Sequence, residues 1–130
     1  MKRPERLPHD DPREWLNRAR SDLVQARNEA PAIYPEDLCF HAQQAAEKAI
    51  KAVMIARGID FPYTHDIARL LRLLDSDGQA IPEHLQWATR LTKYATVLRY
   101  PGIEQPVSAE AHAEAVAVAE AAVRWAEEQV

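Results

Sequence analysis

Glycine and cysteine are scarce in this sequence of 130 residues. Its 3 glycines stand apart from one another, so the chain has no glycine-rich loop of the kind that holds a phosphate between backbone amides. The single cysteine, Cys39, excludes an internal disulfide and a zinc site built from cysteines alone. Because Cys39 has apolar neighbours, we expect a buried and unreactive thiol, not a nucleophile.

Long apolar runs and clustered metal ligands are also missing. No stretch approaches the roughly 18 apolar residues that span a membrane, and the polar start lacks the apolar core of a secretory signal. We therefore expect a cytoplasmic protein that makes no contact with a membrane. The 5 histidines form no His-x-x-x-His or Glu-x-x-x-His cluster on one predicted helix, so we expect no metal and no cofactor.

The charge balance is mildly acidic, with a formal net charge of −4. That balance disfavours a protein that coats nucleic acid, although it leaves a local basic patch open. Hydrophobic residues make up 47% of the chain and charged residues 28%, which is typical of a globular domain and not of a disordered segment. A chain of this length can form a single core without disulfides or metal ions.

Helix-forming residues dominate, and apolar residues recur at helical spacing in five segments. No segment alternates polar and apolar residues as a half-buried strand does. Because short connections place long helices antiparallel, we predict an all-α, up-and-down bundle of four to five helices over residues 11–130, preceded by a flexible arm at residues 1–10. The helices run from Pro12 to about Ala30, from Pro35 up to the terminating Gly58, from the cap Thr64 to Leu74, from Pro82 to Tyr100 and from the cap Ser108 through Trp125.

Polar residues flank the apolar stripe of the second predicted helix. His41, Gln44 and Lys48 stand at i, i+3 and i+7 and therefore share one face. Glu47 and Lys51 stand at i and i+4, the spacing of an ion pair within one helix. Two interpretations stay open. The face is either solvated and held by salt bridges, or it forms a polar wall beside another helix or a ligand.

His65 and Asp66 begin the third predicted helix. A His-Asp pair can indicate catalysis, but adjacent residues on a helix point in different directions. We therefore favour capping of the helix start by Thr64 and Asp66.

The fourth predicted helix carries Arg99 and Tyr100 to its end, because Pro101 pushes the residue before it out of helical geometry. Arginine offers a planar fork for a phosphate, and tyrosine can stack on a base. The structural alternative is that Arg99 pairs with an acid such as Glu47. In the absence of a glycine-rich loop, side chains must hold any phosphate. The cationic side chains that could do so are Lys48, Arg90, Lys93 and Arg99.

Three stretches together resemble the HEPN family, whose name stands for nucleotide-binding domains of higher eukaryotes and prokaryotes. They are FHAQQAAEKAIKAVM at residues 40–54, THDIARLLRLL at 64–74 and LRYPG at 98–102. The first is similar to the family's second helix, the second to its His-Asp-Leu segment and the third to the Arg-Tyr-Pro end of its fourth helix. ARSDLVQA at residues 19–26 is similar to the first helix, and the resemblance spans about residues 12–128.

The resemblance implies a bundle of four or five helices that usually forms a homodimer. Family members are often encoded beside a minimal nucleotidyltransferase in toxin–antitoxin-like pairs. Many are metal-independent endoribonucleases that use an arginine followed four to six residues later by a histidine. Here no histidine follows Arg99 until His112, thirteen positions further on, so that ribonuclease motif is absent. His41 is the substitute that a neighbouring helix of the bundle could supply.

Three functions are therefore expected alternatives. The first is binding of a nucleotide or RNA at a homodimer cleft, in association with a minimal nucleotidyltransferase. The second is a divergent, metal-independent endoribonuclease toxin. The third is a non-catalytic dimerising adaptor whose alanine-rich last helix packs against a partner. For the first, the predicted contact residues are Arg99, Tyr100, His41, Gln44 and Lys48.

Overall fold

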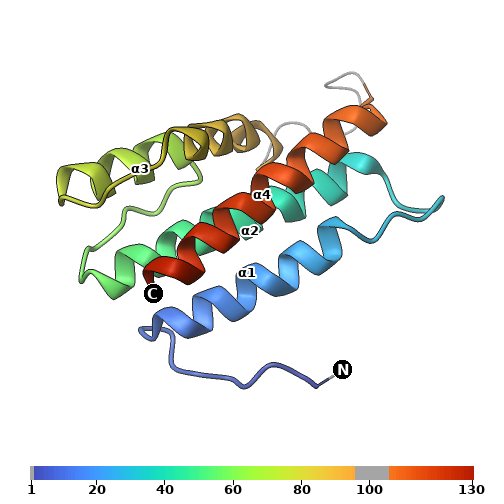
Figure 1. The fold of residues 1–130 in the computed structure, drawn as a ribbon. Helices are drawn as coiled ribbons and strands as arrows, with labels where there is room; N and C mark the ends of the chain where they lie inside the picture. The colour runs from blue at the N-terminus through green and yellow to red at the C-terminus, as the bar shows by residue number, and fades with distance from the viewer. Residues whose placement is uncertain (1, 96–105) are drawn as a thin grey trace.

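The computed structural model describes residues 2–95 and 106–130. These two ranges contain helices and loops and no strand, which confirms the predicted all-α bundle. Figure 1 shows three long helices, α1, α2 and α4, packed together, with α3 and η1 forming a shorter pair against α2 and α4. The elements are α1 (Pro12–Ala26), α2 (Pro35–Ala56), α3 (Ile67–Ser76), the 3₁₀ helix η1 (Glu83–Tyr94) and α4 (Ala109–Gln129).

The helices α1 and α4 begin where their capping residues predict. The Asp11 carboxylate accepts a 2.9 Å hydrogen bond from the backbone N–H of Arg13, and Pro12 occupies the first turn. At the start of α4, the Ser108 hydroxyl oxygen accepts a 3.0 Å hydrogen bond from the backbone N–H of Ala111. Both bonds satisfy amide groups that have no partner inside the helix, so the sequence specifies these two helix starts locally.

The predicted end of α1 near Ala30 is wrong, because the helix ends at Ala26. Residues 27–30 are all exposed, so no burial of side chains stabilises another helical turn there. The limits of α2 agree with the prediction: Pro35 occupies its first turn, and Gly58 follows its end with a φ of 72°, a conformation that suits glycine.

The helix α3 starts later than predicted. Asp66 is its N-cap and accepts a 3.4 Å hydrogen bond from the backbone N–H of Arg69, while the Thr64 hydroxyl accepts one from the backbone N–H of Asp66. Thr64 therefore supports the turn before the helix, and the first helical residue is Ile67. As a result His65 belongs to the preceding loop, where its side chain contacts α2.

The fourth helix, η1, is a 3₁₀ helix, a type that the sequence pattern did not distinguish. Leu85, Ala88, Leu91 and Tyr94 are all buried. Their spacing of three residues matches the three residues per turn of a 3₁₀ helix, so they form one straight edge against the core. Trp87 falls off that edge and is 48% exposed. The predicted end of this helix at the Arg-Tyr-Pro sequence lies outside the described residues.

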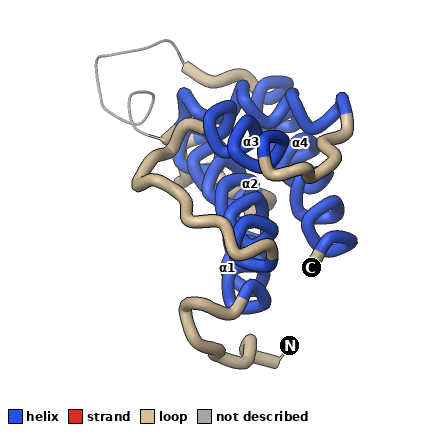
Figure 2. The backbone as a smooth tube through the Cα atoms, turned by 90° about the vertical axis from the view of Figure 1, so that its left-hand side faces the viewer, coloured by secondary structure: helices blue, strands red, loops and turns tan. Residues whose placement is uncertain are grey.

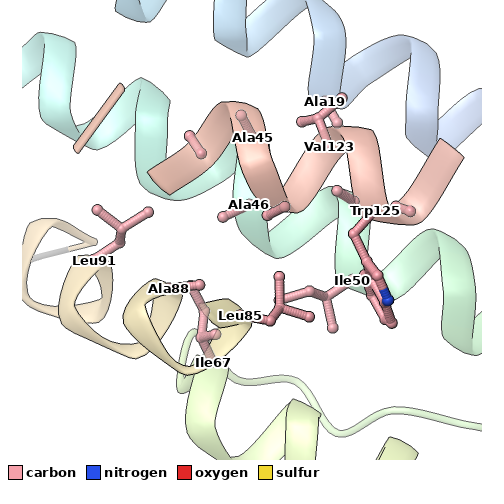
Figure 3. Close-up of a cluster of buried hydrophobic side chains, with 14 of the residues drawn as sticks. Ala19, Ala45, Ala46, Ile50, Ile67, Leu85, Ala88, Leu91, Val123 and Trp125 are labelled. Atoms are coloured by element: carbon pink, nitrogen blue, oxygen red, sulfur yellow. The ribbon is translucent and has the colours of Figure 1, made fainter. Parts of the chain in front are cut away.

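The core is organised around α2, which lies between α1 and α4. Its inner face is rich in alanine, and small side chains allow neighbouring helices to approach closely. The fully buried alanines of α2 are Ala42, Ala45, Ala46, Ala49 and Ala52. Larger side chains fill the space toward η1, where Figure 3 shows Ile50 of α2 between Leu85 of η1 and Trp125 of α4. Because apolar side chains fill the inner face of α2, the polar residues of this helix lie toward α1 and toward the loop that follows α2.

The segment before α1, predicted as an arm, turns back along that helix (Figure 1). The backbone N–H of Leu7 donates a 2.9 Å hydrogen bond to Glu14, and the Trp15 indole N–H donates a 2.7 Å bond to the carbonyl of His9. These contacts bring residues 7–9 next to the outer surface of α1.

Candidate functional site

A buried acid of α1 binds two residues of the predicted polar face. The Asp22 side chain is only 8% exposed. Its Oδ1 lies 3.0 Å from His41 Nδ1, and its Oδ2 accepts a 2.6 Å hydrogen bond from Lys48 Nζ. We call these three residues the Asp22 cluster. The polar face of α2 thus lies beside another helix, and the cluster joins the two helices through one carboxylate.

The two nitrogen-bearing side chains of the Asp22 cluster keep an open side. His41 is 28% exposed and Lys48 is 27% exposed. An ammonium group has three donors and Asp22 takes one, so Lys48 retains donors for a further acceptor. The buried Asp22 carboxylate therefore positions His41 and Lys48, and the exposed part of each side chain can still bind a ligand.

A second buried carboxylate stands on α2 itself. Glu47 Oε1 accepts a 2.8 Å hydrogen bond from Gln43 Nε2 and lies 2.8 Å from His65 Nδ1, and its Oε2 accepts a 2.9 Å bond from Lys51 Nζ. We call these four residues the Glu47 cluster. The Glu47 and Lys51 side chains are 5% and 8% exposed. The predicted ion pair therefore forms, but a solvated face is the wrong interpretation for it.

Hydrogen bonds decide the charge of Glu47. Burial by itself raises the pKa of this carboxyl group, but the hydrogen bonds from Lys51, His65 and Gln43 outweigh burial and leave the pKa below its ordinary value. The group is thus a carboxylate at neutral pH and can only accept hydrogen bonds. Gln43 uses its amide N–H on Glu47 and its oxygen to accept a 2.7 Å bond from Gln44, which joins Gln44 to the cluster.

The loop of residues 57–66 is held on α2 by the same lysine. Lys51 Nζ donates a 3.3 Å hydrogen bond to the carbonyl of Thr64 and lies 5.0 Å from the centre of the Phe61 ring. The Phe61 ring in turn meets the Trp15 ring of α1 edge to face, with centroids 5.4 Å apart. Figure 2 shows this long loop as a tan tube beside α2. These contacts fix the position from which His65 reaches Glu47.

The outer end of the Glu47 cluster is aromatic and exposed. His65 has 45% of its side chain exposed, although Nδ1 contacts a buried carboxylate. Tyr63 is fully exposed, at 103% of its reference area. The two rings lie 6.5 Å apart between centroids and are tilted by 56°. The cluster therefore presents an imidazole edge and a phenol ring side by side at the surface.

A cavity of about 290 Å³ adjoins Lys48 on the side of α1. Its walls carry three basic side chains and one acid, and the acid, Glu14, already binds Arg18 at 2.7 Å. The lining residues are Leu7, His9, Glu14, Trp15, Arg18 and Lys48. The segment before α1 thus supplies part of the wall next to the Asp22 cluster.

The predicted contact residues have different outcomes. The structure brings His41 and Lys48 together on Asp22, and it places Gln44 at the edge of the Glu47 cluster. Arg99 and Tyr100 lie outside the described residues. Two further cations that could hold phosphate lie on η1. Arg90 stacks 3.8 Å from the centre of the Trp87 ring and binds Glu114, and Lys93 lies over the Tyr94 ring.

None of the four members of the Glu47 cluster was among the contact residues predicted from the sequence. One signal was present, because Gln43, Glu47 and Lys51 stand at i, i+4 and i+8, which places a donor on each side of one acid. No such signal exists for His65, which is 18 residues from Glu47 and reaches it through a loop.

Three other expectations can be compared with the structure. Cys39 is buried, and burial raises the pKa of its thiol to about 11, which agrees with an unreactive cysteine. Among residues 2–95 and 106–130, no three His, Cys, Asp or Glu side chains are grouped so that they could hold a metal ion. None of the helices in the described part of the chain combines the length and the apolar character that a membrane span requires.

Comparisons with known proteins give one consistent result. A family model described as HEPN domain matches residues 12–129. The crystal structure of TT1696 from Thermus thermophilus is 33% identical, covers 93% of this chain and 99% of its own, and has a TM-score of 0.79. The crystal structure of ST0689, an archaeal HEPN homologue, is 30% identical, covers 99% of this chain and 98% of its own, and has a TM-score of 0.71. No curated protein matches this chain.

Proposed function

Since this chain belongs to the HEPN domain family, we propose that it binds a nucleotide or RNA at a cleft formed by a homodimer. The observation that supports the proposal is a set of three partly exposed side chains with nitrogen donors, His41, Lys48 and His65, each held by a buried carboxylate. A donor that is positioned in advance loses less conformational freedom when a phosphate binds. The cavity beside Lys48, which is lined by three basic side chains and one acid, extends this surface.

The remaining contacts follow from the predicted residues. In the proposed complex, Arg99 binds phosphate through its planar guanidinium and Tyr100 stacks on a base. The Gln44 amide nitrogen donates a 2.7 Å hydrogen bond to the Gln43 oxygen, so the Gln44 oxygen can accept a hydrogen bond from a base. A second copy of the chain would bring an equivalent set across a twofold axis.

The proposed partner is a minimal nucleotidyltransferase, with which the homodimer would act as a toxin–antitoxin-like pair in the cytoplasm. The family membership supports this part of the proposal. Sedimentation of the purified chain should give the mass of a dimer, and co-expression with a nucleotidyltransferase encoded next to it should give a stable complex. A monomer at micromolar concentration would contradict the shared cleft, whereas a dimer without nucleotide affinity would favour the dimerising adaptor.

Titration with labelled ATP and with a short single-stranded RNA, in the presence of a chelator, tests the binding site. Lys48→Ala and Arg99→Ala should each weaken binding by roughly tenfold or more, because each removes a charged hydrogen-bond donor. Arg72→Ala is the matched control, since Arg72 is an exposed cation on α3 that belongs to neither cluster. Thermal melts of all four proteins show whether a loss of binding reflects unfolding. If Lys48→Ala binds as tightly as Arg72→Ala, the Asp22 cluster is not part of the site.

One observation favours a second candidate, a metal-independent endoribonuclease toxin. The Arg-x4–6-His motif is absent after Arg99, but the structure pairs a different histidine, His65, with a buried carboxylate. A histidine held in this way has the arrangement that proton transfer requires.

A further inference from the structure

A second cavity of about 290 Å³ lies between α1 and the segment before it, residues 2–10, which we call the arm. We propose that this cavity is a separate binding site for a small anion that carries two or more linked phosphate groups. It shares only Glu14 and Arg18 with the cavity that adjoins Lys48. None of the described residues assigned to the nucleotide or RNA site by hydrogen bonding to a buried carboxylate lines it, so the inference goes beyond the proposed function.

Hydrogen bonds hold the arm in place along α1 (Figure 1). Two of them, from the backbone N–H of Leu7 and to the carbonyl of His9, are described above. The third runs from the side-chain amide of Asn17 on α1 to the carbonyl of Glu5, at 3.0 Å. All three use backbone groups of the arm, so its side chains are left to make other contacts. Two prolines within the arm restrict its backbone further.

Three guanidinium groups meet at this cavity, Arg3 and Arg6 from the arm and Arg18 from α1. Arg18 Nε donates a 2.7 Å hydrogen bond to Glu14, which orients the group, yet the side chain is 55% exposed. The terminal nitrogens of Arg18 make no hydrogen bond within residues 2–95 and 106–130. Arg3 and Arg6 are exposed, and neither forms a hydrogen bond or an ion pair in the described part of the chain. The donors of all three arginines are therefore open to a ligand.

Two acids also line the cavity, but they leave the arginines in excess. Both oxygens of Glu14 are already engaged, one by the backbone N–H of Leu7 and the other by Arg18. The exposed Glu5 is the one further acid of the wall. Three arginines thus face two glutamates, in a chain whose formal net charge is −4. This local excess of positive charge attracts an anion to the cavity.

The donors indicate the chemistry of the anion. A guanidinium group binds phosphate through two parallel hydrogen bonds, and three such groups can engage more oxygens than one phosphate carries. Linked phosphate groups supply those oxygens together with three or more negative charges. The Ser21 hydroxyl, which is exposed at the same wall and forms no hydrogen bond in the described ranges, adds a neutral donor.

The size of the cavity limits the rest of the ligand. Sites for small molecules usually measure roughly 300 to 1,000 Å³, so a cavity of about 290 Å³ is at the lower limit. It suits a phosphate chain and leaves a nucleoside outside. Free pyrophosphate and the phosphate end of a nucleotide share this chemistry, and the experiment below separates the two.

Calorimetric titration of the full-length chain with inorganic pyrophosphate, at low ionic strength and in chelator, tests the site. Wild type should bind one anion per chain. Arg3→Ala and Arg6→Ala should each raise the dissociation constant by roughly tenfold or more, because each removes a charged hydrogen-bond donor. Arg72→Ala is the matched control, since it removes the same charge from an exposed position on α3 outside the cavity wall. Circular dichroism establishes that each variant is folded.

Two further variants separate a shaped site from a general attraction of charge. Arg6→Lys keeps the charge and removes the planar fork, so it should lose most of the affinity that Arg6→Ala loses. Asn17→Ala keeps all three arginines but removes the hydrogen bond that holds the carbonyl of Glu5. It should raise the dissociation constant by roughly three- to tenfold, the effect of one lost hydrogen bond. Wild-type affinity in both variants overturns the inference.

Adenosine diphosphate distinguishes the two sources of the phosphate chain. If the free anion is the ligand, this nucleotide should bind no more tightly than pyrophosphate, because the nucleoside lies outside the cavity. Binding that is roughly tenfold tighter, with the same dependence on Arg3 and Arg6, identifies the end of a nucleotide as the source.

The outcomes are distinguishable from those of the proposed function. Lys48→Ala should keep its affinity for pyrophosphate while it loses affinity for RNA. If Lys48→Ala loses pyrophosphate and Arg3→Ala keeps it, the anion belongs to the other site and the inference is overturned. Absence of saturable binding by wild type at millimolar pyrophosphate also overturns it and leaves the proposed function intact. Binding of pyrophosphate by a chain that binds no RNA would support this site and contradict the other.

Discussion

The Asp22 cluster and the Glu47 cluster each join one carboxylate to one lysine and one histidine. In the Asp22 cluster the acid comes from α1 and both partners come from α2, so the contacts tie two helices together. In the Glu47 cluster the acid and the lysine share α2, and only His65 comes from a loop. The lysine is 27% exposed in the first and 8% exposed in the second, whereas the histidine is more exposed in the second, at 45% against 28%.

This difference shows how the same groups can serve different purposes. Both partners of Asp22 lie near solvent, so they can exchange their contacts for water at modest cost. The Glu47–Lys51 pair is out of water, and each charge depends on the other. Because that pair is buried and fixed, it holds the His65 imidazole, which contacts Glu47 and extends toward solvent. The clusters should therefore respond differently to substitution, and four predictions test this, in order of decreasing effect on stability.

The largest effect is expected for Glu47→Ala. Removing this carboxylate leaves the Lys51 ammonium buried without its counter-charge, and losses of this kind cost about 3 to 5 kcal/mol. Urea denaturation followed by circular dichroism measures the free energy of unfolding. The double variant Glu47→Ala/Lys51→Met, which removes both charges, should recover part of the loss. If the single variant costs no more than the equivalent change at Asp22, burial does not distinguish the two clusters.

Asp22→Ala should cost less, about 1 to 2 kcal/mol, because His41 and Lys48 can turn toward solvent when their acceptor is gone. The same denaturation experiment gives the value. Asp22→Asn serves as the control, since it keeps an oxygen for one hydrogen bond and removes the charge. A loss of unfolding free energy as large as that of Glu47→Ala would mean that the Asp22 cluster depends on charge as strongly as the buried Glu47–Lys51 pair does.

A smaller effect is expected in the pH dependence of stability. The pKa of Glu47 in the folded protein lies below its ordinary value of 4.5. Its contribution is therefore complete above about pH 4.5, which is near its pKa in the unfolded chain, and is lost as the pH falls through the lower folded value. The unfolding free energies of wild type and Glu47→Gln, measured from pH 6 down to about pH 3, should converge on the acid side. A constant difference across this range would show that Glu47 is not ionised in the way described.

The smallest effect on stability is expected for Tyr63→Ala, within about 0.5 kcal/mol of wild type, because the side chain is fully exposed. The binding free energy of this variant for single-stranded RNA should nevertheless weaken by the contribution of one stacked base, about 1 to 3 kcal/mol. Fluorescence anisotropy with a labelled RNA measures this loss. Tyr34→Ala, which removes another exposed tyrosine far along the chain, is the control. Equal binding by the two variants would separate Tyr63 from the proposed site.

Much of the fold could be predicted because its determinants are local. Asp11 with Pro12, Pro35 and Ser108 act within one turn of the helix that they begin, so the helix starts are encoded in a few adjacent residues. The type of η1 was harder to predict. Three-residue spacing of its buried side chains was visible in the sequence, but a broad apolar face that included Trp87 concealed it.

The site was less predictable than the fold because its contacts join distant residues. The sharing of one face by His41 and Lys48 follows from helical spacing, but the acid that holds them is 19 and 26 residues away on α1. The pairing of Glu47 with Lys51 was also predictable, whereas its burial was not, because burial depends on the loop that covers it. His65 was assigned to a helix start, and only the later start of α3 at Ile67 allows it to reach Glu47.

One continuous helix, α2, carries members of both clusters, and this places a constraint on how the chain can change in length. Loops at the surface tolerate insertions with little effect on stability. A single residue inserted into α2 between Gln44 and Glu47 would rotate everything beyond it by about 100° and advance it by about 1.5 Å. Lys48 would then leave Asp22 while His41 stayed, and Glu47 would turn away from His65. The stretch from His41 to Lys51 therefore has a fixed length.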